Sequence, residues 1–313
     1  VVAPPRGSPR PRYHAAMISV LAAQVHILDR ITAAAPPELL PLAAALGRVL
    51  ADNVRAEMDV PPTDNSAVDG YAVASADIPV TGTRALEVVA ELAAGSVFAG
   101  TLRAGQALRI MTGAPMPAGA DTVYPQEVVE RRGGSAIVGP LAAGANTRRR
   151  GEDVQAGTVV LPAGSVLRPQ EIGVAASLGL AQLLVRQKPR VAILSTGDEV
   201  AEPGSVRKPG QIYDSNRFSL RGLVEGAGAT AVDDGIVPDQ FDELHARLLR
   251  AAEHADVVLT SGGVSVGDFD LVKAVLQQAG GIDFWQVAMQ PGRPLAVGRI
   301  GRAHFFGLPG NPV

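Results

Sequence analysis

Cysteine is absent from this chain of 313 residues, which excludes disulfide bonds, thiolate catalysis and cysteine-ligated zinc. No apolar run reaches the ~18 residues that a membrane-spanning helix needs, so we expect no membrane partner. The 28 Lys and Arg residues do not outnumber the 31 Asp and Glu residues, and nucleic acid is therefore not expected as a partner either. These absences favour a protein of the reducing cytoplasm.

Several catalytic signatures are also missing. The five histidines are scattered without the spacing of metal ligands, and the sequence has neither a GxSxG nucleophile elbow nor a Walker phosphate loop. Aromatic residues make up only 4% of the chain, whereas glycine occurs 35 times and proline 24 times. We therefore expect a turn-rich protein, and the length predicts two or more domains.

From residue 188 onward, strand-like and helix-like patterns alternate. Such alternation predicts a parallel, doubly wound α/β sheet, whose ligands bind beyond the carboxyl ends of the strands. Two of the strands lead into polar loops, Ser195-Thr196-Gly197-Asp198-Glu199 and Ser261-Gly262-Gly263, so we expect both loops to face one crevice. The strand patterns cover 190–196, 229–237 and 256–260, and the helix patterns cover 214–226, 241–254 and 271–279.

The loop that begins at Ser261 reads SGGVSVGDFD and predicts an anion site. Its glycines, Gly262, Gly263 and Gly267, allow the backbone to turn tightly and to approach a ligand closely. Ser261 and Ser265 add hydroxyl donors. The helix expected to follow would contribute N–H groups and its dipole, which suit a phosphate.

The same loop carries two carboxylates, Asp268 and Asp270, which would repel a bare anion. They are better explained by a divalent cation that bridges them to the ligand. The residues alone therefore predict a site for phosphate and magnesium.

The first half of the chain has a different pattern of apolar, proline and glycine residues. Residues 1–16 are rich in proline and predict a disordered extension or an expression tag. Apolar residues recur with helical spacing over 18–33, and we expect further helices over 39–49 and 169–180. Between 67 and 144, short β-prone runs separated by glycine predict a small β-barrel or sandwich.

Polar clusters in this half allow two interpretations each. Asp69 precedes a glycine and fits an ordinary hairpin turn or a functional position. Thr112 lies in a loop of small residues, and Asp153 ends the sequence RRRGED. The three arginines 148–150 fit either a solvated basic run or an anion clamp. The residue types leave these alternatives open.

Eight sequence blocks, spanning almost the whole chain from Met17, occur in an order that resembles one family. This family is the molybdopterin molybdenumtransferases, which include bacterial MoeA proteins and the E domain of gephyrin. The blocks are NSAVDGYA (65–72), RIMTGAPMPAGAD (109–121), RRRGEDV (148–154), ILSTGDE (193–199), GQIYDSN (210–216), SGGVSVGDFD (261–270), QPGRP (290–294) and GLPGNP (307–312).

The resemblance implies a late step of molybdenum cofactor synthesis. In this step molybdate is inserted into adenylylated molybdopterin, and AMP is released in a reaction that requires Mg²⁺. The resemblance also implies a homodimer, with molybdopterin adenylyltransferase and molybdoenzyme maturation proteins as further partners.

The family's domain plan implies an α/β multidomain chain. Residues 17–60 and 145–187 would form a discontinuous elongated domain of helices and strands, and 61–144 an inserted β domain. Residues 188–313 would form a MogA-like, doubly wound molybdopterin-binding domain. The family's C-terminal β domain is expected to be absent from this chain.

Residue roles follow from the matching motifs. The resemblance implies catalytic roles for Asp69, Thr112, Asp153, Glu199 and Asp270, and metal ligation by Glu199, Asp239, Asp268 and Asp270. It implies substrate contacts for Ser195, Thr196, Gly197, Asp239, Ser261, Gly262, Gly263, Ser265, Gly267, Arg293, Pro309 and Pro312. Because the family's active site lies between protomers, Asp69 and Thr112 are expected to serve the crevice of the partner chain.

One departure from the family pattern concerns molybdate. Gln286 and Gln290 stand where many relatives carry lysine, and Arg293 fills the last basic position. Losing two cations weakens the attraction for a dianion. Two alternatives therefore stay open: a non-catalytic molybdopterin-binding or scaffolding protein on the same fold, and a molybdopterin adenylyltransferase.

Overall fold

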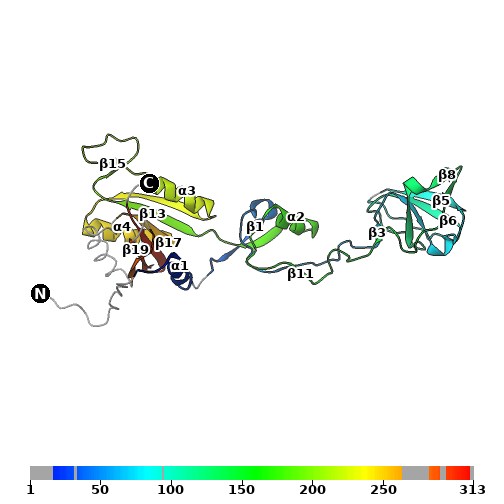
Figure 1. The fold of residues 1–313 in the computed structure, drawn as a ribbon, viewed down its shortest axis with the longest axis horizontal. Helices are drawn as coiled ribbons and strands as arrows, with labels where there is room; N and C mark the ends of the chain where they lie inside the picture. Colours follow the sequence, from blue (N-terminus) through cyan, green and yellow to red (C-terminus); the bar gives the residue numbers. More distant parts are fainter. Residues whose placement is uncertain (1–16, 32–33, 94, 263–281, 290–293, 311–313) are drawn as a thin grey trace. The chain divides into compact units, whose positions relative to one another are not determined.

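The computed structural model describes residues 17–31, 34–93, 95–262, 282–289 and 294–310 (Figure 1). The chain divides into two compact units, which we call unit 1 (residues 1–38 and 185–313) and unit 2 (residues 39–184). The three-domain division expected from the sequence is finer than this one, and it stays a prediction. Among the described residues, no helix combines the length and the apolar character needed to cross a membrane.

Unit 1 is built on a six-stranded sheet in the order β16-β13-β17-β20-β19-β18. The strands are β13 (Arg190–Thr196), β16 (Thr230–Val237), β17 (Val257–Ser261), β18 (Ile282–Gln286), β19 (Pro294–Ile300) and β20 (Ala303–Leu308). The first four strands of the sheet order run parallel, and β19 and β18 are added antiparallel. The predicted parallel sheet is confirmed. The antiparallel pair could not be seen in the alternation of strands and helices.

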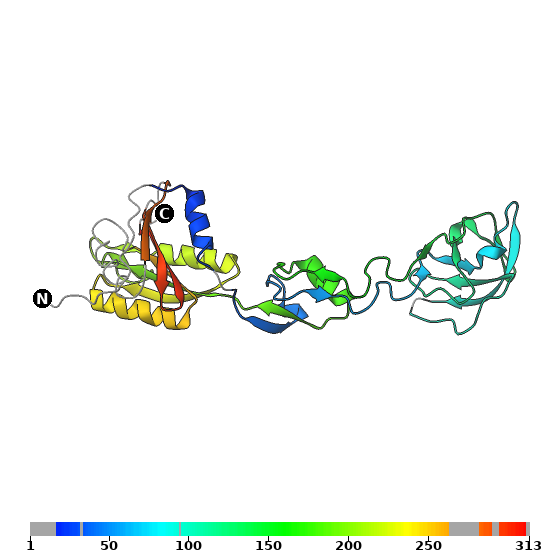
Figure 2. The ribbon, with the colours of Figure 1, turned by 90° about the horizontal axis from the view of Figure 1, so that it is seen from below.

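Helices cover both faces of this sheet. Leu244 and Leu248 of α4 (Phe241–His254) are fully buried in a cluster with Ala192 and Leu194 of β13. Successive side chains of a strand point to opposite faces, so the buried Ile193 faces the other side. There α3 (Asn216–Gly226) packs against β13 and β16, and Figure 2 shows the yellow-green α3 and the yellow-orange α4 on opposite faces. The helix expected over 241–254 is confirmed, and the one expected over 271–279 lies outside the described residues.

Helix α1 (Val20–Leu28) packs on the antiparallel edge of the same sheet. The Ser19 hydroxyl caps its first turn by accepting from the N–H of Ala22 at 3.1 Å. Ala23 is buried in a cluster with Trp285 of β18, and the guanidinium carbon of Arg30 lies 5.0 Å from the Trp285 ring centroid. The helix is shorter than the 18–33 expected from the apolar spacing, because a turn begins at Asp29.

Unit 2 contains a second six-stranded sheet, in the order β7-β4-β6-β5-β9-β8. Tyr71 and Val73 belong to one apolar cluster and Ala72 to another, as the alternation of side chains in β4 requires. Gly70 must be glycine, since an added Cβ would stand 1.8 Å from the Tyr124 carbonyl oxygen of β7. The β-rich insertion predicted over 67–144 has this sheet as its framework. Its strands are β4 (Gly70–Val73), β5 (Arg84–Leu92), β6 (Gln106–Ile110), β7 (Thr122–Pro125), β8 (Glu130–Arg132) and β9 (Ser135–Val138).

Two-stranded sheets and one helix make up the rest of unit 2. The sheets pair β2 (Val54–Arg55) with β11 (Val159–Leu161) and β3 (Asn65–Ser66) with β10 (Thr147–Arg148). Helix α2 (Pro169–Ser177) confirms the helix expected over 169–180. At its start, Glu171 accepts from the Arg168 backbone N–H at 2.9 Å and pairs with the Arg168 guanidinium. These hydrogen bonds lower the pKa of Glu171 to about 2.

The prediction of a helix over 39–49 is wrong. The structure has strand β1 (Pro37–Pro41), which pairs with β12 (Gln182–Arg186), and the short 3₁₀ turn η1 (Leu42–Ala44). The prolines at each end of β1 explain the difference, because each lacks an N–H and disfavours helical backbone before it. Beyond η1, the Gly47 N–H donates to the Leu167 carbonyl and the Leu50 N–H donates to the Ser165 carbonyl. Neither bond is the i to i−4 bond of a helix.

Candidate active site

The carboxyl ends of the parallel strands in unit 1 bring the two predicted loops together. In register, Thr196 of β13 stands beside Val237 of β16, and Ser195 beside Ser261 of β17. Ser261 in turn stands beside Leu308 of β20. Polar residues far apart in the sequence therefore line one edge of the sheet, as the alternation of strands and helices predicted.

Close backbone packing at this edge requires glycine. Gly262 has φ +98°, and a Cβ added there would stand 2.6 Å from the Thr196 carbonyl oxygen. Its N–H donates to the Leu308 carbonyl at 3.1 Å. A Cβ on Gly310 would stand 2.8 Å from the Gly262 Cα. Three strand ends thus meet with no room for side chains between them, which leaves backbone and short hydroxyls to face a ligand.

Buried hydroxyls at the same edge are available for hydrogen bonding. Ser195 and Thr196 are 2% and 3% exposed, and among the described residues neither side-chain oxygen has a hydrogen-bond partner. A buried hydroxyl without a partner is costly. A ligand oxygen at the strand ends would satisfy such a hydroxyl. Because successive side chains of β13 point to opposite faces of the sheet, the two hydroxyls need different acceptors, and their substrate contacts stay predictions.

The loops after β13 and β16 carry the described part of the predicted metal site. The Asp239 N–H donates to Asp198 Oδ1 at 3.3 Å, and the Gly197 N–H donates to the Val237 carbonyl at 3.3 Å. The Glu199 carboxylate turns back over Gly197, where Oε2 lies 2.4 Å from the position of an added Cβ. Carboxylate oxygens from two adjacent loops fit the ligand preference of Mg²⁺.

The complete metal site stays a prediction. No group of three or more His, Asp or Glu is arranged for metal binding within the described residues. Two of the four predicted ligands, Asp268 and Asp270, lie outside those residues. So do five residues expected to bind substrate: Gly263, Ser265, Gly267, Arg293 and Pro312. Pro309, which is half-buried, directly follows β20 at the site edge.

Asn216, which begins α3, reaches this edge as well. Its side-chain Nδ2 lies 2.8 Å from Ser261 Oγ and 3.2 Å from the Gly310 carbonyl oxygen. The sequence reasoning gave Asn216 no role, although it closes the block GQIYDSN that supported the family resemblance. The motif therefore pointed to Asn216, but its contacts with Ser261 and Gly310 depend on how α3 packs.

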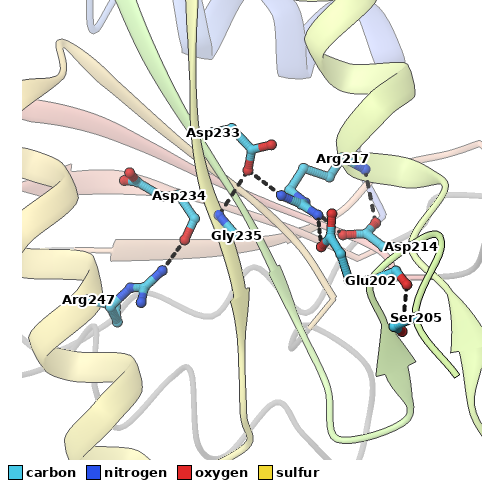
Figure 3. Close-up of polar contacts among 8 residues, drawn as sticks. All are labelled: Glu202, Ser205, Asp214, Arg217, Asp233, Asp234, Gly235 and Arg247. Carbon is cyan, nitrogen blue, oxygen red and sulfur yellow. Dashed lines mark hydrogen bonds and ion pairs between the residues drawn. The ribbon is translucent and has the colours of Figure 1, made fainter. Parts of the chain in front are cut away.

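The next residue, Arg217, is 5% exposed and lies at the centre of an ion cluster, in which Asp214 is buried and Asp233 and Glu202 are exposed (Figure 3). Its guanidinium pairs with Asp214 at 2.9 Å and with Asp233 and Glu202. Burial opposes the charge of Arg217, but the three carboxylates outweigh it and raise its pKa. Burial likewise raises the pKa of Asp233, but hydrogen bonds from Arg217 and Gly235 reverse this and hold it below its ordinary value.

Unit 2 brings two predicted catalytic residues into direct contact. Both the backbone N–H and the hydroxyl of Thr112 donate to Asp69 Oδ1, at 2.7 and 2.6 Å. The hydrogen bond from the Thr112 hydroxyl lowers the pKa of Asp69 most, and the bond from the Thr112 N–H lowers it further. The charge of Arg109 adds a smaller effect in the same direction. Asp69 is therefore a carboxylate held in place by Thr112, which links two loops of unit 2; its catalytic role stays a prediction.

The third predicted residue of unit 2, Asp153, pairs with Arg148 at 2.5 Å. The other two arginines of the run pair with carboxylates too, Arg149 with Asp64 at 3.1 Å and Arg150 with Asp59 at 2.5 Å. The run is thus neutralised by acidic residues within unit 2, which favours a structural role over an anion clamp.

Comparisons with known proteins agree with this geometry. Residues 18–179 match the family model of the MoeA N-terminal region (domain I and II), and residues 192–313 match that of a probable molybdopterin binding domain. A molybdopterin molybdenumtransferase of Haemophilus influenzae is 40% identical over 95% of this chain and 74% of its own length. The chain belongs to the MoeA family of molybdopterin molybdenumtransferases.

Other members of the family are similar over the same length. Molybdopterin molybdenumtransferase 2 of Mycobacterium tuberculosis is 41% identical over 92% of this chain and 73% of its own length. The crystal structure of the molybdopterin biosynthesis MoeA protein from Pyrococcus horikoshii matches with a TM-score of 0.82 and 33% identity, covering 95% of this chain and 75% of that one. MoeA membership confirms the family and fold class expected from the sequence motifs.

One of the two glutamines expected to replace family lysines lies in the described residues. Gln286 is exposed at the end of β18, and its backbone carbonyl accepts from the Ile18 N–H at 2.9 Å. Gln290 lies outside the described residues. Their expected effect on molybdate binding stays a prediction.

Proposed function

We propose that this protein inserts molybdate into adenylylated molybdopterin and releases AMP in a magnesium-dependent reaction. The observation that carries the proposal is the strand edge of unit 1, where unpartnered hydroxyls, glycine-lined backbone and carboxylates meet. The names of the relatives, molybdopterin molybdenumtransferases, support the same reaction. The substrate would be an anion with a flat heterocycle at each end.

The proposed roles follow from the chemistry of the side chains. The hydroxyls of Ser195 and Thr196 would donate to phosphate oxygens, and Glu199 and Asp239 would hold Mg²⁺ together with Asp268 and Asp270. When bound, the metal supplies charge stabilisation to the phosphoanhydride and to the departing phosphate. An oxygen of molybdate would add to the phosphorus on the molybdopterin side. The anhydride bond would then break, and AMP would leave with the electron pair. The two dithiolene thiols would bond to molybdenum in place of two oxygens, one of which stays on the phosphate while the other leaves as water with the two thiol protons.

We further propose that the protein works as a homodimer, in which Asp69 and Thr112 of one protomer complete the site of the other. The support is the family motif that contains both residues, together with the two hydrogen bonds by which Thr112 fixes the carboxylate of Asp69. Molybdopterin adenylyltransferase would supply the substrate, and molybdoenzyme maturation proteins would receive the product.

The test is an assay of AMP release from adenylylated molybdopterin with Mg²⁺ and micromolar molybdate. Glu199→Gln keeps the shape of the side chain but loses a charged ligand, so we expect AMP release to fall at least about 100-fold. The melting temperature should not change by more than a few degrees. Glu253→Gln, an exposed change on α4, is the matched control and should retain full activity.

Two outcomes would count against this function. A wild-type protein that binds the substrate but releases no AMP would favour the non-catalytic alternative. A protein that forms adenylylated molybdopterin from molybdopterin and ATP would favour the adenylyltransferase alternative.

A further inference from the structure

The orientation of the Asn216 amide is fixed by its surroundings. One atom of the amide lies 3.2 Å from the Gly310 carbonyl oxygen, and a backbone carbonyl can only accept a hydrogen bond. That atom must therefore be the nitrogen, Nδ2, because the amide oxygen would be repelled.

The same nitrogen lies 2.8 Å from Ser261 Oγ, and this settles the direction of the second hydrogen bond. An amide NH₂ group has two hydrogens and no acceptor capacity, so Ser261 Oγ must accept. The hydroxyl hydrogen of Ser261 then cannot point at Asn216. It remains available to another acceptor, in a residue that is only 4% exposed.

The neighbouring ion cluster holds Asn216 in this position. Arg217 follows directly in the chain, and Asp214 accepts both from the Arg217 N–H at 3.1 Å and from its Nε at 2.9 Å. The two residues that flank Ser215 and Asn216 are thus tied to each other in the protein interior. The first turn of α3 cannot rotate Asn216 away from the strand ends without breaking buried charged hydrogen bonds.

We propose that Asn216 is a positioning residue that makes Ser261 an obligatory hydrogen-bond donor to a phosphate oxygen of the substrate. By donating to Ser261 and Gly310 together, it also links the last residue of β17 to the second residue after β20. The identity of the phosphate as part of an adenylylated substrate rests on the function proposed above. The donor direction of Ser261 does not depend on it.

Asn216→Asp tests the donor direction with a side chain of nearly the same shape. The aspartate would accept the Ser261 hydrogen and would oppose the Gly310 carbonyl, so Ser261 would no longer donate to the phosphate. We expect the Kd of AMP, measured by isothermal titration calorimetry with Mg²⁺ present, to rise about tenfold or more. Gln24→Glu adds the same charge on the exposed face of α1 and should leave the Kd unchanged.

A double-mutant cycle separates positioning from a general structural effect. Ser261→Ala should weaken AMP binding by itself, and Asn216→Ala should then cause little further loss in that background, since the group that it positions is gone. Additive losses would overturn the proposal, and so would an Asn216→Asp protein that binds AMP as tightly as wild type. The cycle uses Asn216→Ala, which adds no charge. It can therefore be completed even if the Asn216→Asp protein does not fold.

Failure of the role proposed for Asn216 can be distinguished from failure of the proposed function. A wild-type protein that binds AMP but does not release it from adenylylated molybdopterin contradicts the function and leaves the cycle interpretable. A wild-type protein that releases AMP while the cycle is additive contradicts only the role of Asn216.

Discussion

At the scale of single residues, the two hydrogen bonds between Asp69 and Thr112 show what a motif can and cannot predict. The resemblance named both residues, but they are 43 positions apart, and only the fold reveals that one positions the other. Ser195 and Ser261 are different. Their meeting followed from the sequence, because residues at the carboxyl ends of neighbouring parallel strands must share an edge. Asn216 was not predictable, since its reach depends on the packing of α3.

Thr112→Val should raise the pKa of Asp69. The variant loses the hydroxyl, which is the largest contribution to the lowered pKa of this carboxylate, while the backbone donor remains. The pKa should therefore move up toward its ordinary value without reaching it. A titration of the Asp69 carboxyl carbon by NMR measures the shift. Thr83→Val, at an exposed position of the same unit, should leave the Asp69 titration where it is in the wild type.

At the scale of elements, Arg217 joins parts of unit 1 that the sequence pattern treats as separate. It belongs to α3, while its partners Asp233 and Glu202 lie on β16 and directly after β14 (Val200–Ala201) (Figure 3). The bounds of α4 were predictable because its apolar stripe has a strict helical period. Strand β1 was not, because the two leucines between its prolines fit a helix as well as a strand.

Arg217→Met should destabilise unit 1 strongly. The methionine fills a similar volume but leaves Asp214, whose side chain is 2% exposed, as a buried charge without its partner. We expect the free energy of unfolding to fall by about 3–5 kcal/mol, measured by urea denaturation followed by circular dichroism. Arg221→Met removes the exposed pair with Glu225 from the same helix and should cost no more than about 0.5 kcal/mol. Equal losses in the two variants would contradict a special role for the cluster.

At the scale of the whole molecule, residues with proposed catalytic roles occur in both compact units: Glu199 in unit 1, and Asp69 and Asp153 in unit 2. The sequence predicted both groups through motifs of one family. Only the family resemblance predicts that Asp69 serves the site of the partner protomer, because chain order by itself carries no information about the association of two copies.

Two inactive variants should therefore restore each other. If a site takes Asp69 from one protomer and Glu199 from the other, a dimer of Asp69→Asn with Glu199→Gln has one intact site of two. Random exchange makes half of the dimers mixed, so about a quarter of the wild-type AMP release should return when the variants are dissociated and reassociated together. No recovery, with mixed dimers verified by mass spectrometry, would place both residues in the site of a single protomer.

The packing of α1 on β18 has a practical consequence. Trp285 is the single tryptophan of the chain, it is 3% exposed, and it lies with Arg30 against its ring and His26 5.7 Å away. The single tryptophan is thus in unit 1, at the contact between its first helix and its edge strand. Excited at a wavelength that tyrosine does not absorb, Trp285 would report the release of that helix without emission from Tyr71 and Tyr124 of unit 2, so unit 1 can be followed selectively without attaching a dye.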